Sequence, residues 1–184
     1  MKLLKYIHLI FITLIISNQA FSDDNLKEKL KGGGKIIFIR HAYAPGVGDP
    51  DNFSINDCST QRNLNKEGIE QSKKIGKIFK NNFIEIDKIF SSEWCRCKDT
   101  AFYAFKKYKT FSALNSFYDP KFEKKKNLQI KQLQNYIKKW TSNKNLVLIT
   151  HYVVISEILG IGVSSGEIII SDKDFNILFV VETR

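Results

Sequence analysis

Two short, unbroken runs of apolar residues constrain the fold of this chain more than any other feature. Residues 36–39 read Ile-Ile-Phe-Ile, and residues 146–149 read Leu-Val-Leu-Ile. This pattern is typical of strands buried on both faces, as in a parallel sheet, because neither face needs polar side chains. Each run ends abruptly in polar residues: Arg40-His41 follows the first run, and Thr150-His151 follows the second.

The segments around these runs predict alternating helices and strands. Residues 84–91 indicate a further strand, and residues 167–170 and 175–181 indicate a closing hairpin. Helices are predicted at residues 66–80, 93–108, about 130–140 and 152–159, with Asn65 as the cap of the first and Ser91 or Ser92 as the cap of the second. This order predicts an α/β fold: a single-domain, three-layer sandwich with a largely parallel central sheet flanked by helices.

Sheets of this kind bind ligands in a crevice beyond the carboxyl ends of their strands. Arg40 and His41, His151 and the segment leading to Arg96 each leave the end of a predicted strand. We therefore expect these residues to meet at one edge of the sheet. Residues 42–61 form a long loop rich in Gly, Pro, Asp and Asn, and loops of that length are often functional.

Arginine and histidine are scarce, and their positions indicate the chemistry of the site. Of the 29 Lys and Arg residues, only four are arginine: Arg40, Arg62, Arg96 and Arg184. The three histidines are His8, His41 and His151. Arginine supplies a planar, always-charged, two-pronged donor that lysine does not. The pattern therefore predicts an oxyanion site built around imidazole chemistry.

A neutral imidazole is a good nucleophile near neutral pH. Its attack on a phosphate monoester needs one fixed tautomer, positive donors around the phosphoryl oxygens and a proton for the leaving oxygen. Because arginine binds phosphate oxygens bidentately, we expect Arg40 and Arg96, with His151, to surround a phosphoryl group placed on His41.

Two further positions allow alternatives. Arg62 either lines the phosphate site as a substrate-binding residue or pairs with Asp57 or Glu67. Ser91 and Ser92 are expected to act first as a helix cap, although the backbone N–H groups there lie at a helix start that suits anions.

The first 22 residues have the pattern of a secretory signal, with Lys2 and Lys5, an apolar stretch, and Ala20 and Ser22 at a cleavage site. An uncleaved membrane anchor is the alternative, but the apolar stretch is short for a span, which needs about 20 residues. We expect residues 1–22 to be a signal peptide, residues 23–34 a flexible N-terminal segment with Gly32–Gly34 as a joint, and residues 35–184 the domain. The protein is then exported, and is periplasmic or secreted.

The net charge of +10 falls to +8 without the leader, which holds two lysines and no acid. The lysines are scattered rather than gathered among aromatic residues, so we expect no nucleic-acid partner. We also expect no stable membrane association after signal cleavage. The charge can still steer small anionic substrates towards a site.

Cys58, Cys95 and Cys97 lie after the leader, where an oxidising compartment favours one disulfide and one free thiol. Cys95 and Cys97 point to different faces if they lie on one helix, so only one of them reaches Cys58 easily. The residues alone leave open which one. Three cysteines with so few histidines make a poor zinc pattern.

Four segments, in order along the chain, resemble the motifs of the histidine phosphatase superfamily, the phosphoglycerate mutase-like proteins. Residues 37–42 (Ile-Phe-Ile-Arg-His-Ala) resemble its signature, and residues 62–68 resemble its Arg-x-Leu-Thr/Ser-x-x-Gly element. Residues 91–101 resemble its Ser-x-x-x-Arg-x-x-x-Thr-Ala element, and residues 148–151 (Leu-Ile-Thr-His) resemble its second-histidine element. The resemblance covers about residues 35–171.

The resemblance implies a phosphohistidine intermediate on His41 and a phosphate pocket made by Arg40, Arg96 and His151. It implies no metal and no organic cofactor. The expected activity is that of a metal-independent phosphomonoester hydrolase acting on a small phosphorylated substrate or a phosphoprotein. The alternatives are a non-catalytic module that binds phosphate or a phospho-ligand on the same fold, and a surface that binds polyanions through its charge.

The general acid is where the sequence departs from the family. Many members carry a glutamate in a Leu-x-Glu context after the helix of Arg96, and residues 113–119 contain none. Tyr152 follows His151, so the His-Asp pair of acid phosphatases and phytases is missing too. The remaining candidates for the proton donor are Asp119, or an acid of the long loop: Asp49, Asp51 or Asp57. Without a strong acid, substrates with good leaving groups are expected, such as phosphohistidine or acyl phosphates.

Overall fold

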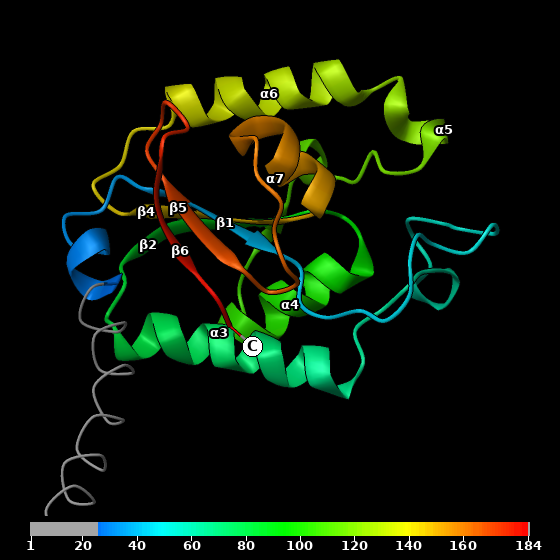
Figure 1. The fold of residues 1–184 in the computed structure, drawn as a ribbon, viewed down its shortest axis with the longest axis horizontal. Helices are drawn as coiled ribbons and strands as arrows, with labels where there is room; N and C mark the ends of the chain where they lie inside the picture. Colours follow the sequence, from blue (N-terminus) through cyan, green and yellow to red (C-terminus); the bar gives the residue numbers. More distant parts are fainter. Residues whose placement is uncertain (1–25, 184) are drawn as a thin grey trace, which may run out of the picture.

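A six-stranded sheet forms the centre of the protein in a computed structural model, which describes residues 26–183 (Figure 1). The strand order is β3-β2-β4-β1-β5-β6. The strands are β1 Ile36–Arg40, β2 Ile86–Ser91, β3 Lys109–Thr110, β4 Asn145–Thr150, β5 Ile168–Ser171 and β6 Ile177–Val181. β1, β4, β2 and β3 run parallel to one another, whereas β5 and β6 are antiparallel to their neighbours. The predicted α/β fold with a largely parallel sheet and a closing hairpin is confirmed.

Helices cover both faces of this sheet. They are α3 Lys66–Asn81, α4 Cys95–Phe105, α5 Pro120–Glu123, α6 Lys126–Lys139 and α7 Tyr152–Leu159, with single 3-10 turns η1 Cys58–Thr60 and η2 Ser112–Leu114. In Figure 1, α3 and α4 lie on one face of the sheet, and α6 and α7 lie on the other. The three layers expected from the sequence are therefore present.

The apolar runs of β1 and β4 are unbroken because alternate side chains of each strand pack into the core on opposite faces of the sheet. Ile36 and Phe38 pack in the core on the side of α6 and α7. Ile37 and Ile39 pack in the core on the side of α3 and α4. All four side chains are fully buried. Successive strand residues point to opposite faces, so a strand covered on both sides needs apolar residues throughout.

The start of α3 confirms the predicted cap. The Asn65 side chain accepts a hydrogen bond from the backbone N–H of Gly68 at 2.9 Å. Gly68 also lets the helix approach the chain that leaves β1, because a Cβ there would lie 2.0 Å from the carbonyl oxygen of Tyr43. The close contact places the residues after His41 firmly against α3.

The predicted cap of α4 is wrong. The N-cap residue is Trp94, and its side chain makes no capping bond. Ser91 donates its hydroxyl to the carbonyl of Ser92, and the Ser92 hydroxyl contacts His151, so both serines have other partners. The helix is also shorter than predicted, because Lys106 takes a positive φ of 66° at its end.

The segment before β1 is packed where the structure describes it, which corrects the expected flexible stretch at residues 23–34. Residues 26–30 are helical, and Leu26 and Leu30 are buried in the core beside β1. Gly33 lies so close to Asn143 that a Cβ would fall 1.9 Å from its carbonyl oxygen. The predicted signal peptide lies outside the described residues. Within residues 26–183, no helix is long and apolar enough to cross a membrane.

Candidate active site

The carboxyl ends of β1 and β4 bring the two histidines together. The parallel register pairs Arg40 with Thr150, and the N–H of His41 donates to the carbonyl of Thr150 at 2.9 Å. The rings of His41 and His151 then lie 5.5 Å apart between centroids, edge to face. The expected meeting of strand ends from distant parts of the sequence is present at this edge.

His41 is held in one orientation and is 2% exposed. Its Nδ1 lies 2.8 Å from the carbonyl oxygen of Ala42, which accepts only if Nδ1 carries the proton. Nε2 therefore keeps its lone pair. Burial, followed by the positive charge of Arg96, holds the pKa of His41 well below its ordinary value, so the ring is neutral near neutral pH.

His151 is equally enclosed, with 3% of its surface exposed. Its Nε2 lies 2.8 Å from the Ser92 hydroxyl and 3.4 Å from the Cys97 sulfur. Burial lowers the pKa of His151 well below its ordinary value, and the charge of Arg96 lowers it further. Two neutral imidazoles thus stand side by side.

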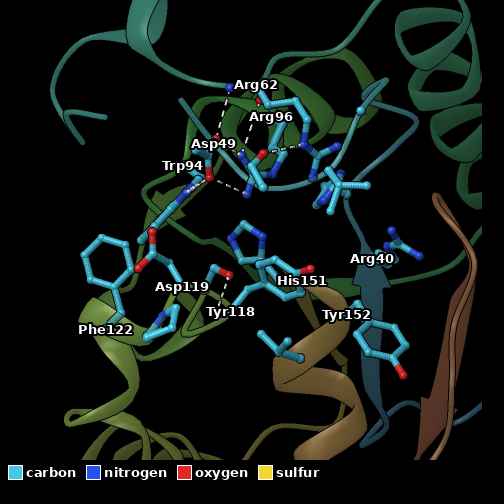
Figure 2. A pocket seen from close by; sticks show the side chains of 17 residues that line it. Arg40, Asp49, Arg62, Trp94, Arg96, Tyr118, Asp119, Phe122, His151 and Tyr152 are labelled. Atoms are coloured by element: carbon cyan, nitrogen blue, oxygen red, sulfur yellow. Dashed lines mark hydrogen bonds and ion pairs between the residues drawn. The ribbon is translucent and has the colours of Figure 1, made fainter. Parts of the chain in front are cut away.

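Arg96, at the start of α4, is bound by an acid of the long loop. Its Nη1 lies 2.7 Å from Asp49 Oδ1, and its Nη2 lies 3.1 Å from Oδ2 (Figure 2). Asp49 also accepts from the backbone N–H of Arg62 at 3.0 Å and from the indole Nε1 of Trp94 at 3.1 Å. Partial burial alone would raise the pKa of Asp49, but these donors, led by Arg96, lower it overall.

Arg40 and Arg62 border the same cavity and are hydrogen-bonded to backbone carbonyls. Arg40 donates to the carbonyl of Val163 at 2.6 Å. Arg62 donates through Nε to the carbonyl of Gly48 at 2.8 Å and through Nη1 to the carbonyl of Ala44. Arg62 therefore lines this cavity and is bonded to the long loop, and the alternative pairing with Asp57 or Glu67 is not what the structure contains.

The cavity between these residues has a volume of about 300 Å³. It is lined by Arg40, His41, Gly46, Val47, Gly48, Asp49, Arg62, Trp94, Arg96, Ser116, Tyr118, Asp119, Pro120, Phe122, His151, Tyr152 and Val153. The sequence prediction missed the aromatic part of this lining: Tyr118 and Phe122 come from a segment without a motif, and Trp94 occupies an unspecified position of the element at residues 91–101. It also missed the ion pair between Asp49 and Arg96. The only sign of this pair in the sequence is that Asp49 lies between Gly48 and Pro50 in the long loop.

The candidate acids separate into two groups. Asp49 and Asp119 line the cavity, whereas Asp51 and Asp57 do not. Asp119 caps α5 by accepting from the Lys121 N–H at 2.9 Å, and its other oxygen lies 3.1 Å from the Lys121 ammonium group. These bonds lower the pKa of Asp119. Both acids at the cavity are therefore ionised near neutral pH and already accept hydrogen bonds.

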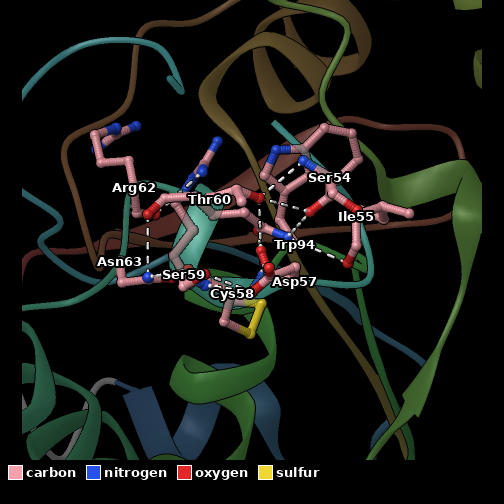
Figure 3. The surroundings of a disulfide bond; sticks show 12 residues. Ser54, Ile55, Asp57, Cys58, Ser59, Thr60, Arg62, Asn63 and Trp94 are labelled. Carbon is pink, nitrogen blue, oxygen red and sulfur yellow. Dashed lines mark hydrogen bonds between the residues drawn. A yellow bond between two sulfur atoms is a disulfide. The ribbon is translucent and has the colours of Figure 1, made fainter. Parts of the chain in front are cut away.

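A disulfide joins Cys58 to Cys95 and ties the end of the long loop to the first turn of α4 (Figure 3). One disulfide and one free thiol were expected, and the structure selects Cys95 as the partner. Cys97 is the free thiol, and burial raises its pKa to about 12. The bridge holds Cys95 directly before Arg96, so the loop that carries Asp49 is anchored beside its ion pair. Within residues 26–183, no three His, Cys, Asp or Glu side chains are grouped to hold a metal ion.

The chain has an α/β fold that matches solved structures of phosphoglycerate mutase-like proteins. Solved structures of this fold match most of the chain. The protein histidine phosphatase SixA complexed with tungstate is 15% identical, with a TM-score of 0.58, over 81% of this chain and 97% of that one. Phosphoglycerate mutase from Thermus thermophilus is 14% identical, with a TM-score of 0.57, over 80% of this chain and 98% of that one. A mutant of phosphoserine phosphatase from Entamoeba histolytica in complex with phosphoserine is 17% identical, with a TM-score of 0.53, over 74% of this chain and 89% of that one.

These likenesses are of fold, because the identities are low. No protein-family model matches the chain, and no curated protein matches it. The neighbours are phosphatase and mutase proteins, and the chain shares their fold.

Proposed function

We propose that the protein is a metal-independent phosphatase that hydrolyses phosphomonoesters through a phosphohistidine on His41. The observation that carries the proposal is the bond from Nδ1 of His41 to the carbonyl of Ala42. It leaves the Nε2 lone pair for a ligand in a cavity that Arg40, Arg96 and His151 also line.

In the first step, the Nε2 lone pair of His41 attacks phosphorus, and the bond from phosphorus to the leaving oxygen breaks with its electrons on that oxygen. Arg40 and Arg96 stabilise the charge on the phosphoryl oxygens. The Nε of Arg96 is buried and has no hydrogen-bond partner among the described residues. When Ser92 donates to Nε2 of His151, the proton of that ring is on Nδ1, from which it donates to the phosphoryl group.

In the second step, water attacks the phosphohistidine. The bond between phosphorus and Nε2 breaks with its electrons returning to the ring, and phosphate and one proton are released. The low pKa of His41 assists both steps. In the first step it keeps the ring unprotonated in the free enzyme, and in the second step it makes the ring a good leaving group.

The test is turnover of a generic aryl phosphate by the parent, by His41→Ala and by His41→Asn, each in excess chelator. We expect the parent to be active with chelator and to form a phosphoenzyme that survives a rapid denaturing quench. Both variants should lose turnover by about 10⁴-fold or more, since removal of a nucleophile leaves only residual catalysis. Circular dichroism checks that they fold. Full activity of either variant, or loss of parent activity with chelator, would refute the mechanism.

A second candidate is a module that binds a phospho-ligand without turnover. The observation that favours it is that both acids at the cavity, Asp49 and Asp119, have lowered pKa values and neither is poised to donate a proton. It predicts that inorganic phosphate binds measurably while no phosphoenzyme forms with any ester.

We further propose that the protein is exported, and that its substrate is a small phosphorylated compound or a phosphoprotein rather than nucleic acid or a membrane. The leader-like residues 1–22 support export, and so does the Cys58–Cys95 bridge, because disulfides persist in oxidising compartments. Fractionation of cells that produce the full chain tests this, and recovery with the cytosol would contradict it.

A further inference from the structure

The mouth of the cavity suggests the chemistry of its substrate. Building on the proposed phosphatase activity, we infer that the group leaving from phosphorus is a phenolate, an oxygen carried on an aromatic ring, so that the substrate class is an aryl phosphate. Two independent observations lead there: the aromatic walls of the cavity, and the absence of a poised proton donor among the residues described as lining it.

One wall is a row of contacting aromatic rings that begins at His151. The Trp94 indole lies 5.4 Å from the His151 ring and 5.5 Å from the Phe122 ring, both edge to face. Phe53 stacks on Trp94 at 5.1 Å and supports it from behind the cavity lining. A group that extends outwards from a phosphoryl group beside His151 therefore passes along Trp94 and Phe122.

The facing side of the cavity has an exposed ring too, Tyr152, and the Arg40 guanidinium lies beside it, 5.8 Å from the ring centroid. Tyr152 lies across His151 from Trp94 and Phe122 (Figure 2). Tyr152 is 44% exposed, Tyr118 is 60% exposed and Val47 is 84% exposed, although all three line the cavity. Large apolar side chains gathered at a cavity mouth indicate a site for an apolar ligand group. A flat ring fits such walls best, because ring pairs gain more than their buried area alone provides.

The polar groups at the cavity explain why the leaving group must depart easily. Asp119 accepts hydrogen bonds from Lys121, and Asp49 accepts them from Arg96, so neither holds a proton to give. A phenol such as that of tyrosine has a pKa of about 10 and leaves as a phenolate far more readily than an aliphatic alkoxide. When His41 Nε2 attacks, the bond from phosphorus to the aryl oxygen breaks with its electron pair on that oxygen. The phenolate then takes its proton from water.

An acyl phosphate also has a good leaving group but has no ring to contact these walls. The two contributions can therefore be separated with three substrates: phenyl phosphate, acetyl phosphate and glycerol 2-phosphate. We expect kcat/KM for phenyl phosphate to exceed that for glycerol 2-phosphate by about tenfold or more. Phosphotyrosine, free and within a peptide, then distinguishes a small aryl phosphate from a phosphoprotein as the source of the ring.

Two wall variants test the contact itself. Phe122→Leu and Tyr118→Ala should raise KM for phenyl phosphate about threefold to tenfold while kcat stays near that of the parent. The KM for acetyl phosphate should rise less than the KM for phenyl phosphate in either variant. Phe102→Leu is the matched control, because Phe102 is also a partly exposed ring but does not line the cavity.

Binding of phenylphosphonate and propylphosphonate, measured by calorimetry, tests ring recognition without any turnover. The inference is supported if the parent binds phenylphosphonate more tightly than propylphosphonate and if Phe122→Leu removes this preference. Equal binding of the two phosphonates, or equal efficiency on phenyl phosphate and glycerol 2-phosphate, overturns it and leaves the phosphatase proposal intact. Ring-selective binding without turnover of any ester overturns the phosphatase proposal instead.

Discussion

Asp49 and Arg96 form a two-pronged ion pair at the cavity that the phosphoryl group is expected to enter, with contacts of 2.7 Å and 3.1 Å. The carboxylate occupies both Nη groups of Arg96, an arginine that we expect to bind the phosphoryl group. The site therefore contains an anion of its own, held in place by Trp94 and by the backbone of Arg62. A phosphoryl dianion entering the cavity has to displace Asp49 or accept its charge nearby.

Asp49→Asn should consequently bind inorganic phosphate about tenfold more tightly than the parent, because it removes the neighbouring negative charge. The same change leaves the buried Arg96 without its counter-charge, so the free energy of unfolding should fall by about 3 kcal/mol. Calorimetric titration and denaturant unfolding measure the two effects. Weaker phosphate binding in the variant would mean that Asp49 positions Arg96 rather than competing for it.

The stability of the fold should decrease on acidification in a range set by the histidines. The pKa values of His41 and His151 are lowered in the folded state, so below about pH 6.5 the unfolded state binds more protons. Above about pH 6.5 the two histidines do not lower the free energy of unfolding. Below that pH, the free energy of unfolding falls progressively until the pH reaches the pKa values of the histidines in the folded state.

Denaturant unfolding at a series of pH values measures this slope. His151→Asn removes one titrating group and should flatten the profile below about pH 6.5. The carboxylates contribute only at lower pH, since their unperturbed pKa values are about 4. If the free energy of unfolding of the parent stayed constant between about pH 6.5 and about pH 4, this would contradict the neutral state of both rings.

Removal of the Cys58–Cys95 bridge should lower the free energy of unfolding by about 4 kcal/mol, the loop-closure value for a sequence separation of 37 residues. Cys58→Ser combined with Cys95→Ser, compared with the parent in denaturant, measures the loss. A reductant should destabilise the parent and leave the double variant unchanged. In the folded, reduced protein, Cys97 should resist alkylation, because burial raises its pKa to about 12.

Gly68→Ala should disturb both the fold and the site. The added Cβ would lie 2.0 Å from the carbonyl oxygen of Tyr43, so α3 and the segment after His41 must separate. We expect a loss of about 2 kcal/mol in unfolding free energy and a lower kcat. Gly162→Ala is the matched control, because its Cβ would come no closer than 3.9 Å to a neighbour. Equal stability of the two variants would show that the close approach is not required.

The sequence determined the sheet and the placement of the histidines. The apolar runs of β1 and β4 predict doubly covered strands, and parallel strands place their carboxyl ends at one edge of the sheet, where His41 and His151 lie in contact. The cap at Asn65 was also readable, because it depends on residues within one turn. The caps predicted at Ser91 and Ser92 were wrong, because a distant residue, His151, engages the Ser92 hydroxyl.

Only the tertiary structure decided how the site is completed. The bond between Asp49 and Arg96 spans 47 residues, and the path of the long loop that carries Asp49 is set by its contacts with Arg62 and Trp94. The choice of Cys95 over Cys97 likewise follows from which face of α4 the loop crosses. Periodicity and spacing report local geometry and strand ends. Contacts between a loop and a distant helix depend on the packed surfaces, and no local pattern contains them.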